Sequence, residues 1–165
     1  MEKNIRQQLT LFVAKKDAIE IEKIRNKFNP IQQNLIDCHV TLCREDEITN
    51  LDNVLDNLKN LDSLVITIQF GQVRRFDNNK GVLIPAFGDN EQFHQLREKI
   101  LNPIPVRRHE PHLTLMHPRN SNCTNEVFEE IKSINLPTNL KFDTISHIEQ
   151  RDGGKWQILQ TFNLQ

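Results

Sequence analysis

Residues 112–115 read His-Leu-Thr-Leu, and residues 39–42 read His-Val-Thr-Leu. The chain has only six histidines among 165 residues, so two copies of His-x-Thr-Leu are improbable by chance. Each copy is a short run with apolar residues at alternate positions, which predicts a β-strand. Side chains of a strand alternate between its faces, so His and Thr of each copy share one face and the apolar pair occupies the other.

The sequence around the motif is repeated as well. An Asn-Pro pair precedes each copy, and Pro30 and Pro103 each stand nine residues before the motif histidine. A helical apolar pattern leads into each pair, and proline disfavours helix in the residue before it. Each half is predicted to run strand, helix, motif strand, helix and hairpin. We therefore expect residues 1–165 to form a single domain of two repeated lobes.

Turn and capping residues predict where other elements begin and end. The first strand is expected over Thr10–Lys15. Residues 64–70 and 82–87 are expected to form one hairpin around Asn78–Gly81, and Arg151–Gly154 predicts another. The side chains expected to cap helices are Asp17, Thr49, Asp89 and Thr124.

Composition limits the class of protein. Apolar residues make up 37% and charged residues 26%, and the net charge is −1, so a soluble globular chain without an affinity for long duplex nucleic acid is expected. No apolar run is long enough for a membrane span, and Leu9–Ala14 is too short for a signal peptide. Cys38, Cys43 and Cys123 form no CxxC pair, which is typical of reduced thiols in a cytoplasmic protein. We expect a monomer.

Two imidazoles and two hydroxyls suit phosphoester chemistry if the motif faces of the two halves meet. An imidazole pKa near 6.5 allows one histidine to act as a base and the other as an acid. Threonine hydroxyls can donate to phosphoryl oxygens where negative charge is held. No cofactor or metal is required for this chemistry.

Two His-x-Thr-Leu motifs about seventy residues apart resemble those of the 2H phosphoesterase superfamily, which includes the 2′–5′ RNA ligases and cyclic phosphodiesterases. The resemblance extends to a first strand in TLFVAK and to both hairpins. It implies a bilobal α/β fold with two antiparallel-rich sheets that face a central cleft, and with helices outside. It places His39, Thr41, His112 and Thr114 on the catalytic positions.

The resemblance also implies the activity. Members open 2′,3′-cyclic phosphates, or cleave or join 2′–5′ linkages of RNA ends or small nucleotides, without a metal. One histidine activates water or a ribose hydroxyl, and the other protonates the leaving oxygen. Relatives often have Tyr where this chain has Trp156, and many have Arg soon after the second motif, where this chain has Met116-His117. These departures leave the substrate open.

Three further residues are candidates for substrate contact. Phe12 and Trp156 can stack on a base, although aromatic residues of apolar strands more often pack in the core. Arg119 belongs to a cationic cluster with Arg107, Arg108, His109 and His117, which could hold a phosphate or could be a solvated loop.

Other interpretations stay open at this level. Zinc could use His109, His112 and His117, or Cys38, His39 and Cys43, but neither spacing matches a tetrahedral site. A binding module would recognise nucleotides or RNA ends without turnover. A structural domain would bury both motif histidines far from each other.

Overall fold

The two motifs form two adjacent strands in the middle of one large sheet. In this computed structural model, which describes residues 3–165, the first motif is β2 (His39–Cys43) and the second is β6 (His112–Met116). The strands pair antiparallel, with Val40 opposite Leu113. Both strands show the same alternation, with His and Thr half-buried and the residues between them buried, as period-two patterning predicts.

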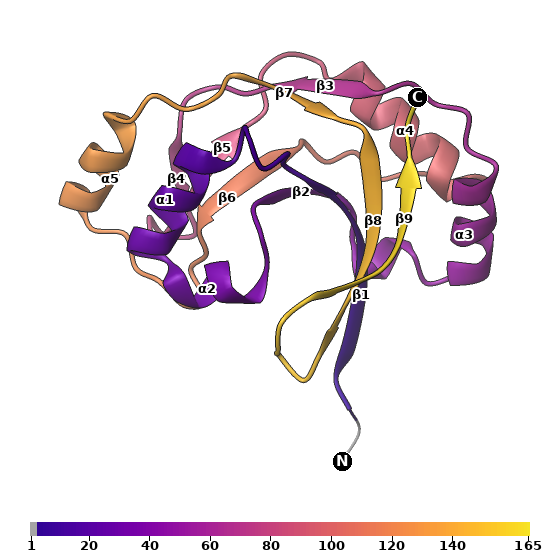
Figure 1. Ribbon diagram of the computed structural model, residues 1–165, viewed down its shortest axis with the longest axis horizontal. Coiled ribbons are helices and arrows are strands. Elements are labelled where there is room, and N and C mark those ends of the chain that lie inside the picture. The colour runs from indigo at the N-terminus through magenta and orange to yellow at the C-terminus, as the bar shows by residue number, and fades with distance from the viewer. Residues whose placement is uncertain (1–2) are drawn as a thin grey trace.

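The large sheet has seven strands, all paired antiparallel (Figure 1). In spatial order they are β4 (Arg74–Phe76), β5 (Gly81–Pro85), β6, β2, β1 (Ile5–Phe12), β8 (Thr144–Arg151) and β9 (Gln157–Asn163). Outward from the central β6–β2 pair come β5 and β1, and then β4 and β8. This order is the one expected when the two halves of a chain contribute equivalent strands to one sheet.

A small second sheet and the helices complete a mixed α/β fold. The small sheet pairs β3 (Ile66–Gln69) with β7 (Asn139–Phe142) and lies along the upper edge in Figure 1. The helices are α1 (Ile19–Phe28), α2 (Pro30–Leu35), α3 (Leu51–Lys59), α4 (Glu91–Leu101) and α5 (Asn125–Lys132), with a short 3₁₀ turn η1 (Glu45–Glu47). Among residues 3–165, no helix combines the length and apolar character that a membrane crossing requires.

The first hairpin differs from its sequence-based prediction. The turn after Phe76 joins β4 to β5, whereas residues 66–69 pair with β7; of the expected pairing, Phe70 forms an isolated antiparallel bridge to Ala86. Ile66 and Ile68 are buried and stand opposite Phe142 and Leu140, so the apolar face of β3 is matched by that of β7. Proximity in sequence predicted that β3 pairs with β5. The match between the apolar faces of β3 and β7 therefore outweighs that proximity. The second hairpin, β8–β9 around Asp152–Gly153, is confirmed.

Helix ends follow the sequence closely, with small shifts. Both Asn-Pro pairs end helices as predicted, at Phe28 and Leu101. Thr124 caps α5, since its hydroxyl accepts a hydrogen bond from the Val127 N–H at 3.2 Å. The predictions at Asp17, Thr49 and Asp89 are wrong by one residue, because the capping positions are Ala18, Asn50 and Asn90.

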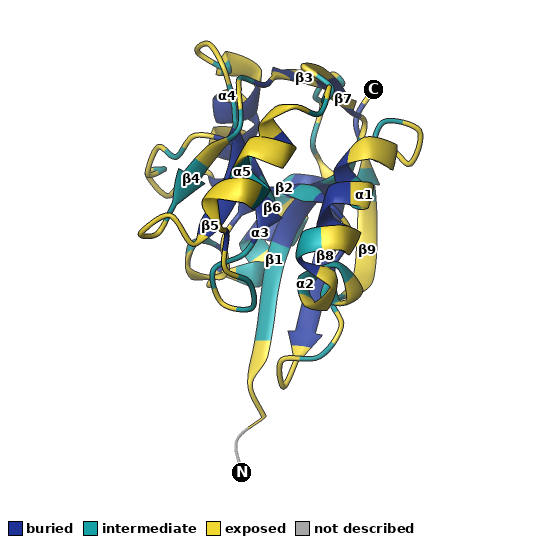
Figure 2. Cartoon of the chain, turned by 90° about the vertical axis from the view of Figure 1, so that its left-hand side faces the viewer, coloured by how far each residue is buried: buried dark blue, intermediate teal, exposed yellow. Residues whose placement is uncertain are grey.

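The core lies behind the motif strands. Val40, Leu42, Leu113 and Leu115 are at most 1% exposed and belong to one continuous apolar cluster. Figure 2 shows the buried residues concentrated along the strands of the large sheet, while the outer faces of the helices are exposed. Because the apolar residues of each motif are held in this core, the His and Thr side chains must project from the other face of the sheet.

Candidate active site

The antiparallel register of β2 and β6 sets the geometry of the four motif side chains. Val40 stands opposite Leu113, so the neighbouring positions place His39 opposite Thr114 and Thr41 opposite His112. Directly opposed residues have Cβ atoms about 4.5–5.5 Å apart, and diagonal ones are about 7–8 Å apart. The two histidines therefore occupy one diagonal of a quadrilateral and the two threonines the other. A single phosphoryl group can fit between two imidazoles at this separation.

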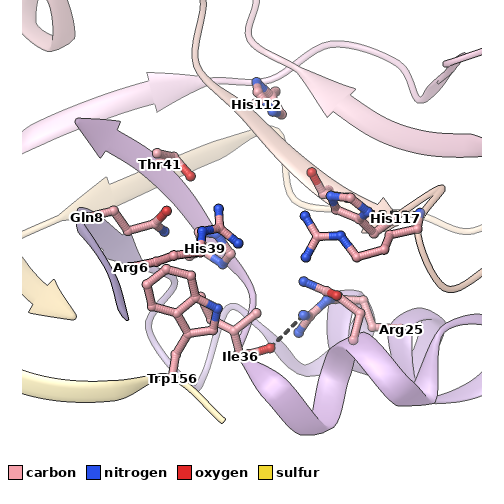
Figure 3. A pocket seen from close by; sticks show the side chains of 12 residues that line it. Arg6, Gln8, Arg25, Ile36, His39, Thr41, His112, His117 and Trp156 are labelled. Carbon is pink, nitrogen blue, oxygen red and sulfur yellow. Dashed lines mark hydrogen bonds between the residues drawn. The ribbon is translucent and has the colours of Figure 1, made fainter. Parts of the chain in front are cut away.

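All four side chains line one pocket of about 170 Å³ (Figure 3). Two of the three predicted substrate contacts, Arg119 and Trp156, line it as well. Phe12 does not, although its ring meets the His39 ring edge-on with the centroids 6.1 Å apart. The full lining consists of Arg6, Gln8, Arg25, Gln32, Ile36, His39, Thr41, His112, Thr114, His117, Arg119 and Trp156.

Hydrogen bonds to the backbone orient the motif histidines. His39 Nδ1 lies 2.8 Å from the Asp37 carbonyl oxygen, and His112 Nδ1 lies 3.3 Å from the Glu110 carbonyl oxygen. A carbonyl only accepts, so Nδ1 carries the proton in both rings and each neutral imidazole keeps a free lone pair on Nε2. The same two-residue relation recurs in both halves. Each histidine is thus prepared to take up a proton at Nε2.

His117 is a third imidazole of the pocket, with the opposite tautomer. Its Nδ1 accepts a hydrogen bond from the Arg119 N–H at 3.1 Å. The neutral ring must therefore carry its proton on Nε2, where it is a donor. The backbone N–H of His117 donates to Asn29 Oδ1 at 2.7 Å, which ties this segment to the end of α1. His117 is suited to hold an anion, while the motif histidines are suited to exchange protons.

Burial shifts the imidazole pKa values in one direction. Desolvation lowers the pKa of His39 to about 4; the bond to the Asp37 carbonyl opposes this shift, and the positive charge of Arg25 adds to it. Desolvation also lowers the pKa values of His112 and His117, with nearby arginines adding to the effect. An empty pocket therefore holds mainly neutral imidazoles at neutral pH. A bound phosphate would favour protonation, because an opposite charge raises an imidazole pKa.

Arginines make the pocket cationic. Arg25 is 2% exposed; it donates to the Ile36 carbonyl at 2.6 Å and forms an ion pair with Glu22. The guanidinium of Arg6 lies 5.5 Å from the centre of the Trp156 ring and pairs with Glu45 at 3.0 Å. Within residues 3–165, the pocket lining includes no Asp or Glu. The site therefore presents positive charge to a ligand although the whole chain has a net charge of −1.

Five lining residues were missed from the sequence. Arg6 and Gln8 lie on the polar start of β1, which was predicted to begin only at Thr10. Their spacing of two from each other and from Thr10 is a signal that could have extended the strand. Arg25 lies beside the apolar stripe of α1, where Ile21 and Ile24 are buried with it. The remaining two, Gln32 and Ile36, lie in and after α2, a helix that starts at Pro30 and had no clear apolar pattern.

The other predicted clusters are not assembled around the pocket. Arg107 pairs with Asp46 at 3.5 Å and Arg108 with Glu110 at 3.2 Å, outside the lining. The His109 ring packs edge-on against Phe93, with centroids 5.6 Å apart. Of the cationic cluster expected near the second motif, His117 and Arg119 reach the pocket.

The fold is similar to that of E. coli LigT. E. coli LigT in complex with phosphate superposes with a TM-score of 0.62 at 11% identity, over 99% of each chain. E. coli LigT in complex with NADP+ superposes with a TM-score of 0.63 at 12% identity, over 96% of each chain. The protein TT0787 of Thermus thermophilus superposes with a TM-score of 0.60 at 17% identity, over 96% of this chain and 97% of the other.

The family follows from the sequence match. The model of the 2′-5′ RNA ligase superfamily matches residues 13–154, which include both motifs. The chain therefore belongs to the 2′-5′ RNA ligase superfamily, and the resemblance predicted from the motifs is confirmed. Comparison with curated protein sequences gives no match.

Proposed function

We propose that this protein is a phosphodiesterase that acts on a 2′,3′-cyclic phosphate or a 2′–5′ phosphodiester of RNA ends or small nucleotides. The observation that carries the proposal is the diagonal pair of motif histidines in one cationic pocket. Both rings keep Nε2 free, as proton transfer to and from reacting oxygens requires. Family membership agrees with this class of reaction.

The proposed step is a single displacement at phosphorus. One motif histidine, neutral, takes a proton from water or a ribose hydroxyl, whose oxygen forms a bond to phosphorus. The other histidine, protonated, gives its proton to the ribose oxygen that leaves as the second phosphorus–oxygen bond breaks. The Thr41 and Thr114 hydroxyls donate to the non-bridging oxygens, where they offset developing charge. With water as nucleophile the result is hydrolysis, and with a ribose hydroxyl the result is ligation.

Substrate contacts are proposed from the same lining. Arg119, exposed and next to His117, is positioned to pair with phosphate oxygens. Trp156, half-buried under Arg6, offers a ring face for a base. Structures of E. coli LigT with phosphate, 3′-AMP, ATP and NADP+ support a small nucleotide ligand for this fold. Three buried, unpaired cysteines fit the cytoplasm as the compartment.

Variants of the two motif histidines test the proposal. His39→Gln and His112→Gln should each lower kcat on 2′,3′-cyclic AMP and on 2′–5′ ApA by about 10²–10⁴-fold, the usual contribution of one acid or base. His147→Gln is the control, because His147 is bonded to Gln7 outside the pocket. Product formation is measured by chromatography, with and without EDTA. Retained activity in both motif variants would contradict the proposal, and stoichiometric nucleotide binding without product would favour a binding module.

A further inference from the structure

A second cavity adjoins the pocket at His39. It has a volume of about 1040 Å³ and begins at Phe12, whose ring meets the His39 ring. Asp37 also lines it, and the Asp37 carbonyl is the group that orients the His39 imidazole. The Phe12–His39 ring pair is thus a wall shared by both cavities. We call the larger cavity the Phe12 groove, with a lining from Phe12–Asp17, Asp37, β3, β7, β8 and β9.

The Phe12 groove continues the face of the sheet that carries the motif residues. In the register of β1 and β2, Phe12 stands opposite His39 and Thr10 opposite Thr41. Thr10 also stands opposite Ser146 of β8, which lines the groove. Directly opposed residues of an antiparallel pair point to the same face. The groove therefore extends from the motif histidine across β1, β8 and β9 on one continuous surface.

The sizes of the two cavities complement each other. Pockets for small molecules typically have volumes of about 300–1,000 Å³. The pocket at the motif residues, at about 170 Å³, can hold a phosphoryl group and part of its sugar but not a whole nucleotide. The groove, at about 1040 Å³, has room for a further nucleoside on the His39 side.

The chemistry of the groove fits a nucleoside. Phe12, Val65 and Ile158 supply apolar surface, and Ile158 is 58% exposed although it is large and aliphatic. Hydroxyls from Thr67, Thr144, Ser146 and Thr161 and the amide of Asn139 can bond to base edges and sugar hydroxyls. Three lysines and three aspartates contribute to the lining, so it carries no net charge, in contrast to the arginine-lined pocket. A neutral base and ribose suit this lining better than a second phosphate does.

We propose that the Phe12 groove binds the nucleoside on the 5′ side of the nucleotide that carries the reactive phosphate, so that the preferred substrate is an oligonucleotide and not a mononucleotide. This inference rests on the proposed function, because the reactive phosphate is placed between His39 and His112. The next nucleoside of the strand then passes the Phe12 ring and lies over β8 and β9. Its base packs on the apolar part of the groove, and the polar side chains contact its edge.

A comparison of substrate lengths tests the inference. The two substrates are 2′,3′-cyclic AMP and ApA that ends in a 2′,3′-cyclic phosphate, and the second is longer by one nucleotide. Stacking and contact of one added base should raise kcat/KM for the dinucleotide by about tenfold. Ile158→Asp places a charge in the groove and should reduce the ratio of the two kcat/KM values toward one. Leu159→Asp is the control, because Leu159 is 50% exposed on the same strand but outside the lining, and should keep the ratio.

Binding is measured separately with 3′-AMP and ApAp, through the fluorescence of Trp156, the single tryptophan. Tighter binding of ApAp that Ile158→Asp abolishes supports the groove even if neither cyclic substrate is turned over, a result that would overturn the proposed function alone. Equal kcat/KM values for the two cyclic substrates, or a ratio unchanged in Ile158→Asp, would overturn the groove and leave the proposed function in place. Equal affinity for 3′-AMP and ApAp would overturn the groove as well.

Discussion

Replacing Arg97 by methionine is expected to lower the free energy of unfolding by about 3–5 kcal/mol, the usual cost of removing one partner from a buried ion pair. Arg97 is fully buried and donates to both carboxylate oxygens of Glu47, at 3.0 and 2.6 Å. It also donates to the Leu42 carbonyl at 2.6 Å and to the Arg107 carbonyl at 2.8 Å. One side chain thus ties β2 to the segment that leads into β6.

The magnitude follows from what the substitution leaves behind. Methionine fills much of the volume, so the main loss is electrostatic: the Glu47 side chain, 10% exposed, keeps its charge without its partner. Burial by itself raises the pKa of Glu47, but the hydrogen bonds from Arg97 and from the Arg44 N–H, together with the charge of Arg97, outweigh it and hold the pKa below the ordinary value. A carboxyl pKa that is lower in the folded than in the unfolded chain stabilises the fold at pH values above the unfolded pKa. This contribution to the free energy of unfolding is lost as the pH falls through the folded pKa. In Arg97→Met the Glu47 pKa rises instead. Acidification should therefore reduce the difference in the free energy of unfolding between wild type and Arg97→Met.

Urea unfolding of wild type, Arg97→Met, Glu47→Gln and the double variant forms the assay. The double variant should lose less stability than the sum of the single losses, because no unpaired charge remains. Arg108→Met is the control; its ion pair with Glu110 is exposed, so it should cost about 0–1 kcal/mol. A loss below about 1 kcal/mol in Arg97→Met, or simple additivity in the cycle, would refute the role assigned to the buried pair.

Three further predictions concern the site and the thiols. Because burial lowers the pKa values of both motif histidines, and that of His39 to about 4, kcat/KM should peak below pH 6.5 and fall as the acid histidine loses its proton; a maximum above pH 7.5 would contradict this. Thr114→Val removes one donor to the phosphoryl oxygens and should lower kcat by about 10²–10³-fold with little effect on stability, while a loss below about threefold would exclude the role. Burial raises the pKa values of Cys38 and Cys43 to about 12, so Ellman's reagent should label both only as fast as the protein unfolds, and immediate labelling would contradict their burial.

The repeat illustrates how far residue patterns reach. Both Asn-Pro pairs end a helix, as predicted, and the proline of each pair stands nine residues before a motif histidine. Their asparagines nevertheless have different roles. Asn29 is 1% exposed and bonds to His117 and Asn120, whereas the Asn102 carbonyl accepts from Asn53 and Asn57 of α3. Equal spacing in sequence therefore predicted equal helix ends but not equal contacts.

Local patterns were sufficient for the motif strands, their alternating faces and the family to which the chain belongs. This is possible because strand periodicity and proline geometry act over a few residues, so their effects can be predicted from the sequence. The sequence left open how the two motifs are placed relative to each other, and the structure pairs them side by side in a single sheet. Which strands become neighbours depends on matching buried faces far apart in the chain, as the pairing of β3 with β7 also shows.

The arginines of the pocket are also brought together only by contacts between distant parts of the chain. Arg6, Arg25 and Arg119 are separated by 19 or more residues and come from a strand, a helix and a loop. No local pattern distinguishes them from surface cations, because each becomes a pocket residue only when β1, α1 and the segment after β6 pack together. The histidines could be found from the order of residues, since a strand presents them in a fixed way. The charge around them arises from packing, since Coulomb interactions depend on distances that only the folded chain sets.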